Sequence, residues 1–509
     1  MAPLGSLATA AAAGAAAAII AAVVGARYRS LSLPSTGVGG MVMTAVELRI
    51  AALEEEAAGL HEAAKRHNLQ GDFEGAKAAY RRMYAVEDKA LRLAAESESE
   101  SPGDAEGGSA EEAEAVAVVA LAEYASLLPL PASPWADRAT QRRALGAVLG
   151  AVVADAAAMG VHWVYDPKEL DRLYGVKQSM LSAEAEAEAE AEEVGLDFFQ
   201  PPQSPFFSYE SGRASPYGEQ TLALLASLVD RQGLHPLRYA EALARQFGTG
   251  WDGYRDASLK GFLRHYYRGR RPPRTGAHDW QANCFTRLGP VVAAYHAGGE
   301  EEGLALLLTA VERATRVTQN TDRAVAWARA GAAVLARVVG GFPVDDAVAG
   351  VVSELTDAAT VLGGDVRFKE LNAEIAGCVR RVHEMAHEGQ SVHATVAALG
   401  RNCHLPNSFQ TPLHAALLYS LPAKGGAAEA VGAMTAAERQ RVYQSAVRAA
   451  LREGGCCASR ATYVGACLGA WLAGSGELDF LPPEWVVKVT GFERTRELAE
   501  ALVGLRRVD

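Results

Sequence analysis

The amino-acid sequence predicts an all-α protein, and three observations lead to this fold class. From about Ala136 to the end of the chain, alanine, leucine and valine recur at intervals of three and four residues, the period of an amphipathic helix. Glycine, proline and asparagine interrupt the pattern, as helix ends require. The alternating apolar and polar runs that mark strands do not occur in this part of the sequence. We therefore expect a compact multi-helical domain over residues 136–507, preceded by a helical hairpin. The clearest periodic segments are residues 145–159, 221–230, 304–317, 323–338, 392–399 and 441–451.

Composition narrows the class of protein. The chain has 509 residues, of which 49% are hydrophobic, enough for a sizeable core and too many for a disordered polar chain. The formal net charge is −12 and no basic stripe is present. Nucleic acid is therefore excluded as the main partner, because phosphate binding needs clustered Lys and Arg. The six cysteines are scattered and form no CxxC pair, which favours a reducing compartment over a disulfide framework.

Residues 1–45 are predicted to form a targeting or membrane-anchor segment. They contain no Asp or Glu, and Leu7–Ala26 is an apolar run of 20 residues, long enough to span a bilayer. Twelve of those residues are alanine, which supplies little insertion energy. An acid-free segment of Ala, Ser and Arg suits a cleaved transit peptide. We expect targeting to an organelle, plastid or mitochondrion, with a membrane anchor or a secretory signal as the alternatives.

Residues 46–95 have helical periodicity on both sides of Gly71 and Asp72, a helix stop followed by a capping residue. This pattern predicts a helical hairpin that could bind a protein partner. Residues 96–114 are rich in Ser, Glu and Gly and are predicted to be a disordered acidic linker. The Ala/Glu tract at 183–193 offers no apolar face to bury and is interpreted as a solvated insertion.

A short motif, His383-Glu384-Met385-Ala386-His387, suggests a zinc site. Two histidines at i and i+4 share one face of a helix, and Glu384 could serve as the base of a zinc peptidase. His393 stands where the longer peptidase motif has a third ligand, but Gly389 is one place early for that motif. The alternative is a solvated helix end, because charged residues surround both histidines.

A second feature is a run of small, apolar residues that begins at Gly146, includes Gly150 and ends at Asp155. Glycines four residues apart on a helix leave a strip where another backbone can approach closely. Asp155 must then face a cavity or find hydrogen-bond partners, because burying an unpaired charge is costly. Both interpretations, a functional carboxylate and a structurally satisfied one, are open at this point.

The run from Gly146 to Asp155 resembles the opening helix of the ADP-ribosylglycohydrolase family, G-x-x-x-G-x-x-x-G-D, with Ala154 in place of the third glycine. Its continuation, Met159 to Asp166, is similar to the branch that contains J1-crystallin and selenoprotein J. The resemblance covers about residues 143–503. Further matching segments follow in order at Tyr217-Gly218-Glu219-Gln220-Thr221, Thr318-Gln319-Asn320-Thr321-Asp322, Asn402-Cys403-His404-Leu405-Pro406-Asn407-Ser408-Phe409 and Gly454-Gly455-Cys456-Cys457-Ala458-Ser459-Arg460.

The resemblance implies an all-α hydrolase with two magnesium ions, acting on an ADP-ribose-type small molecule or an ADP-ribosylated acceptor. The family's metal positions fall on Gly218, Glu219, Gln220, Cys456, Ala458 and Ser459, so most of the family's ligands are substituted. The resemblance leaves Glu219, Gln220 and Ser459 as magnesium ligands. It also implies Glu219 and Asp155 as catalytic residues, and His162 and Tyr217 as substrate-binding residues.

Three functions follow from these observations. The first is an ADP-ribosylglycohydrolase-like hydrolase with a degraded magnesium site. The second is a catalytically inactive binding or structural protein of the same fold, similar to the J1-crystallins. The third is a zinc peptidase that uses His383, Glu384 and His387. The first two predict that Asp155, Glu219 and Ser459 lie near a common cleft.

Overall fold

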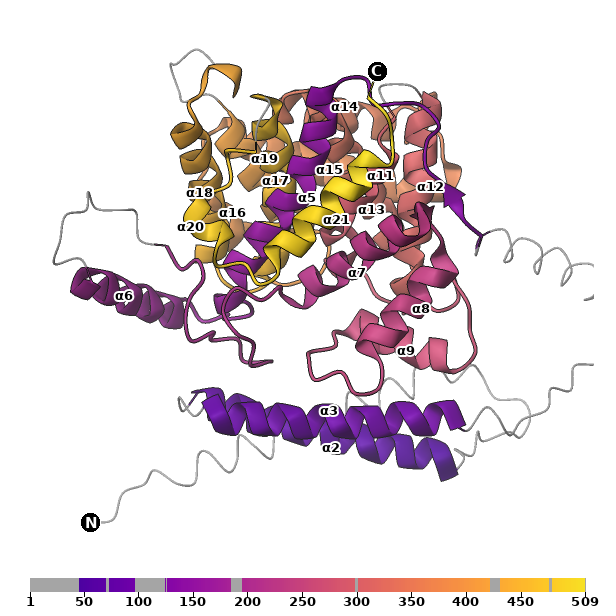
Figure 1. Cartoon of the computed structure of the whole chain (residues 1–509), viewed down its shortest axis with the longest axis vertical. Helices are drawn as coiled ribbons and strands as arrows, with labels where there is room; N and C mark the ends of the chain where they lie inside the picture. Colours follow the sequence, from indigo (N-terminus) through magenta and orange to yellow (C-terminus); the bar gives the residue numbers. More distant parts are fainter. Residues whose placement is uncertain are drawn as a thin grey trace, which may run out of the picture. The chain divides into compact units, whose positions relative to one another are not determined.

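The computed structural model describes residues 45–69, 73–96, 124, 126–184, 195–297, 301–421, 431–475 and 478–508. In these ranges nearly all regular structure is helical (Figure 1). The only strands among the described residues are β1 (Leu128–Pro129) and β2 (Gly233–Leu234), an antiparallel pair in which Leu128 lies opposite Leu234. The predicted all-α fold class is confirmed.

The periodic segments predicted from the sequence fall on α5, α7, α12, α13, α16 and α18. The longer helices after residue 130 are α5 (Arg138–Ala158), α6 (Pro167–Glu184), α7 (Pro216–Arg231), α8 (Pro236–Phe247), α9 (Ala257–Tyr267), α12 (Glu301–Thr318), α13 (Asp322–Val339), α14 (Val344–Thr356), α15 (Lys369–His387), α17 (Asn407–Ser420), α18 (Ala436–Arg452), α19 (Cys457–Leu472) and α21 (Phe492–Gly504). The shorter ones are α10 (Asn283–Thr286), α11 (Leu288–Tyr295), α16 (Val392–Leu399) and α20 (Pro483–Val486).

Two further helices, α2 (Ala45–Leu69) and α3 (Phe73–Glu96), occupy the range expected for the helical hairpin. They lie side by side (Figure 1), and Ala57 and Ala64 of α2 pack with Ala79 and Met83 of α3. The segments predicted as a targeting signal and as an acidic linker lie outside the described residues, except for their ends at Ala45 and Glu96. Most of the Ala/Glu tract lies outside them as well.

The core of the domain is built on α5 and α19, which pack backbone against backbone. A Cβ atom added to Gly150 would lie 2.3 Å from the carbonyl oxygen of Gly465, and one added to Gly146 would lie 2.3 Å from that of Gly469. Both helices therefore need glycine at the contact. The glycine strip predicted from the sequence is confirmed by this close helix contact.

Burial explains the apolar composition of α5. Of the described residues, one helix, Arg138–Val161, has the length and hydropathy that could cross a membrane, and 94% of its most apolar stretch is buried inside the protein. Flanking helices supply that burial, because Val148, Leu149 and Val153 belong to the hydrophobic core of the domain. The position of α5 in the centre of the core therefore accounts for its apolar sequence.

Candidate functional site

Asp155 lies near the end of α5 and is held by three hydrogen bonds. The backbone N–H of Ser215 donates to Oδ2 at 2.7 Å, and the hydroxyls of Ser215 and Thr462 donate to Oδ1 at 2.6 and 3.1 Å. The residue is 1% exposed. Burial raises the pKa of this carboxyl to about 6, and the hydrogen bonds from Ser215 and Thr462 work in the opposite direction. Asp155 therefore joins α5 to the start of α7 and to α19.

The first residues of α7 are placed by a cap. Ser215 is the N-cap, its hydroxyl accepts from the backbone N–H groups of Tyr217 and Gly218, and Pro216 occupies the first helical position. Serine followed by proline is a typical helix start. A Cβ atom added to Gly218 would lie 2.1 Å from Asp155 Oδ2. The first of the family's metal positions is therefore closed by the Asp155 carboxylate.

Glu219 is the second of these positions, and its carboxylate is already paired. Arg213 donates to Oε1 through Nε at 2.8 Å and through Nη2 at 2.6 Å, while the Tyr209 hydroxyl donates to Oε2 at 3.1 Å. The Glu219 side chain is 8% exposed. Burial raises its pKa to about 7 and is opposed by Arg213. This carboxyl can change its protonation state near neutral pH.

Gln220, the third position, belongs to a buried amide–carboxylate network. Its Nε2 donates to Asp256 Oδ2 at 2.7 Å, and Asn283 Nδ2 donates to the same oxygen at 2.7 Å. Asn283 also donates to Gln220 Oε1 at 3.3 Å. Asp256 is in turn the N-cap of α9. The amide of Gln220 is therefore used inside the protein.

The second family motif lies at the start of α19, beside α7. Cys456 Sγ is 3.4 Å from the Tyr217 hydroxyl and 3.0 Å from Ser459 Oγ. Burial opposes the thiolate, but hydrogen bonding with Cys403, Ser459 and Tyr217 lowers the pKa of Cys456 below its ordinary value. The Ser459 hydroxyl donates to the Cys456 carbonyl at 3.0 Å. The contact between Tyr217 and Cys456 thus joins the first motif to the second.

His162 and Tyr217, which the resemblance implies as substrate-binding residues, are both 0% exposed. His162 Nδ1 accepts from the backbone N–H of Ala458 at 3.1 Å, and its ring stacks on Trp163 with 4.2 Å between centroids. Tyr217 packs edge-on against His162. Both side chains support the site from inside the core and present no surface to a dissolved ligand.

Residues that sequence reasoning missed complete the site. Ser215, Arg213 and Asp256 hold Asp155, Glu219 and Gln220 respectively. The Ser215-Pro216 pair could have been recognised in the sequence as a helix start. Asp256, two residues before Ser258, could likewise have been recognised as a helix N-cap. No local pattern marks Arg213 as the partner of Glu219.

The residues at the six family positions do not fit two magnesium ions. Magnesium takes near-octahedral oxygen ligands and is attracted by carboxylates. Glu219 supplies the one carboxylate among the six, and Arg213 neutralises it. Cys456 and Ala458 supply a thiol and a methyl group. Among the described residues, no group of three or more His, Cys, Asp and Glu ligand atoms converges at these positions.

The fold and the site together define a multi-helical domain with a buried carboxylate centre at the meeting point of α5, α7 and α19. The chain belongs to the ADP-ribosylglycohydrolase family, whose sequence profile matches residues 136–509. The match covers the domain predicted from the sequence and excludes the N-terminal hairpin.

Similar proteins include two crystallins. Crystallin J1A of Tripedalia cystophora is 26% identical over 374 residues, which cover 71% of this chain and 96% of that protein. Crystallin J1B of Tripedalia cystophora is 24% identical over 380 residues, covering 72% and 97%. A solved structure described as an ADP-ribosylglycohydrolase-related protein complex is 21% identical, with a TM-score of 0.44, and covers 72% of this chain and 99% of that one.

Proposed function

We propose that this chain is a non-catalytic member of the ADP-ribosylglycohydrolase family that serves as a structural or binding protein. The observation that carries the proposal is the state of the metal positions. Gly218 has no room for a side chain beside Asp155, and Glu219 is neutralised by Arg213. Because these positions offer no carboxylate free to bind a cation, they provide no metal-binding site for two-metal hydrolysis of an ADP-ribosyl bond.

The burial of the expected substrate contacts supports the same proposal. His162 and Tyr217 are both 0% exposed, so an ADP-ribose-type ligand could reach them only after the core opened. The names of the two relatives, Crystallin J1A and Crystallin J1B, agree with a non-catalytic role.

Glu219 favours a second candidate, hydrolysis of an ADP-ribosyl bond without metals. A general acid or base works best when its pKa is near the working pH, and burial raises the pKa of Glu219 to about 7. In this mechanism Glu219 would protonate the leaving group or activate water. Arg213 and Tyr209 oppose this mechanism, because their hydrogen bonds occupy both carboxylate oxygens of Glu219.

The test is an assay of the purified full-length chain on peptides that carry ADP-ribosyl-arginine or ADP-ribosyl-serine. We expect no turnover with Mg²⁺ or with a chelator, and no heat of Mg²⁺ binding in calorimetry. Turnover that requires Mg²⁺ would overturn the proposal. Turnover that survives the chelator and disappears in Glu219→Gln would establish the second candidate instead.

Two further proposals rest on the sequence. We propose that residues 1–45 direct the chain to a plastid or mitochondrion, and that the α2–α3 hairpin binds a protein partner. Localisation of fluorescent fusions with and without residues 1–45 tests the first. Affinity capture with and without residues 46–95, followed by reconstitution with the purified candidate, tests the second.

A further inference from the structure

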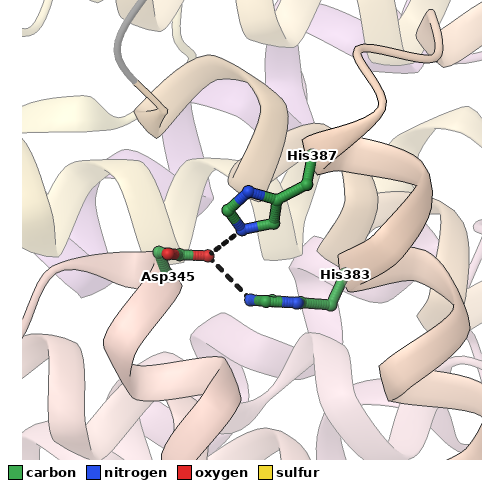
Figure 2. A group of neighbouring side chains, drawn as sticks. All are labelled: Asp345, His383 and His387. Carbon is green, nitrogen blue, oxygen red and sulfur yellow. Dashed lines mark hydrogen bonds and ion pairs between the residues drawn. The ribbon is translucent and has the colours of Figure 1, made fainter.

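A cluster of three side chains lies at one end of the α14–α15 helix pair and includes none of the family's metal positions. Figure 2 shows His383 and His387 of α15 pointing toward Asp345 of α14. The Nε2 atoms of both histidines lie 2.8 Å from Asp345 Oδ1. The ligand atoms of the three residues all lie within 4.8 Å of one another.

Helix geometry explains why the two histidines converge. Residues four apart share a helix face, and the ring centroids of His383 and His387 are 4.5 Å apart. Asp345 stands in the first turn of α14, whereas His387 is the last residue of α15. The start of one helix therefore meets the end of the next, and the connecting segment 357–368 lies at the opposite end of the pair.

Hydrogen bonding alone does not account for the arrangement. His387 Nε2 makes a hydrogen bond with Asp345 Oδ1 at 2.8 Å. His383 Nε2 is buried and makes no well-directed hydrogen bond, although it lies equally close to the same oxygen. Two imidazole nitrogens and a carboxylate oxygen thus converge, with their ligand atoms all within 4.8 Å of one another, as a set that could hold a cation.

We propose that His383, His387 and Asp345 bind one divalent transition-metal ion of the zinc type, with a coordination position left for water. Imidazole and carboxylate are common zinc ligands, and three protein ligands plus one open position is a recurrent zinc geometry. The exposed fractions of these side chains are 25%, 46% and 33%, so the cluster lies near the protein surface. The site does not depend on the proposed function, because it shares no residue with the family's metal positions.

The third ligand differs from the one that the peptidase motif suggests. His393 lies on α16, where its Nδ1 is 3.1 Å from Glu453 Oε2, and it is not part of the cluster. Asp345, which lies on the neighbouring helix α14, supplies the third ligand instead. The ion would therefore link the start of α14 to the end of α15, at the end of the pair that has no connecting segment.

Calorimetric titration of the full-length chain with Zn²⁺ tests the proposal. We expect one binding event that weakens about 100-fold or more in Asp345→Ala and in His387→Ala, since each removes a direct ligand. His393→Ala is the matched control, because it removes a neighbouring histidine whose side chain is 76% exposed and which lies outside the cluster. Zinc affinity in this control should equal that of the parent.

Hydrogen exchange separates loss of the site from loss of the fold. In the parent and in His393→Ala, Zn²⁺ should slow amide exchange in the first turn of α14 and the last turn of α15. In Asp345→Ala and His387→Ala these amides should exchange at one rate with and without Zn²⁺, while α5 and α19 stay protected. Absence of zinc binding by the parent up to about 1 mM, or equal affinity in the parent and Asp345→Ala, would overturn the proposal.

Discussion

Replacing Gly150 with alanine tests the backbone contact between α5 and α19, and we expect it to destabilise the domain. The added Cβ would lie 2.3 Å from Gly465 O and 3.0 Å from Gly469 Cα, and neither backbone atom can rotate away. Overpacking a core costs about 1–3 kcal/mol, and a backbone clash puts this variant at the upper end. The better helix propensity of alanine offsets about 1 kcal/mol. The net loss in the free energy of unfolding should be about 2 kcal/mol.

Gly377→Ala is the matched control for this variant. Gly377 also lies inside a helix, α15, but no atom lies within 4 Å of its added Cβ. Alanine should therefore stabilise the protein here by about 0.5–1 kcal/mol. Urea unfolding of both variants and the parent, followed by circular dichroism, measures the two differences. If Gly150→Ala is as stable as the parent while Gly377→Ala gains stability, α5 and α19 do not need glycine at their contact and the reasoning is wrong.

Three other predictions concern the site. Because burial raises the pKa of Glu219 to about 7 in the folded protein from its ordinary 4.5, folding favours its protonated form, and the parent should lose stability as the pH rises from 5 to 8. Glu219→Gln cannot titrate, so its stability relative to the parent should improve by up to about 3 kcal/mol over that range, and a constant difference in urea unfolding would contradict this. Cys456→Asp combined with Ala458→Asp should raise Mg²⁺ affinity, because two oxygen ligands are restored; equal calorimetric heats for parent and variant would contradict it. Asp256→Ala should lower the free energy of unfolding by about 3 kcal/mol, since it leaves Gln220 and Asn283, the buried partners of the carboxylate, unsatisfied. The control is Asp137, the exposed N-cap of α5, whose side chain accepts from the backbone N–H of Thr140. Asp137→Ala removes only this cap and should lower the free energy of unfolding by about 1 kcal/mol; equal losses would show that the buried network contributes nothing beyond a cap.

The sequence by itself determined the fold class and the elements that build the core. Helical periodicity is a local property, since side chains three and four residues apart must share a face wherever the helix finally packs. The spacing of Gly146 and Gly150 likewise predicted a close contact with another helix, although it did not identify α19 as that helix. The ordered motifs from Gly146 to Arg460 also sufficed for the family, which the profile match over residues 136–509 confirms.

Only the tertiary structure decided what the polar residues do. Asp155 is bonded to Ser215 and Thr462, which are 60 and 307 residues away along the chain, and nothing in the local sequence names these partners. The same holds for the His383–His387 pair, whose third neighbour is Asp345 of α14 and not His393.

The physical reason lies in the range of the interactions. A helix is specified by neighbours within four residues, whereas the charge state and hydrogen bonding of a buried carboxyl depend on whatever the packed helices bring within about 3 Å. The sequence shows that Glu219 stands at a family metal position. Arg213 and Tyr209, placed around it by the fold, donate hydrogen bonds to both of its carboxylate oxygens.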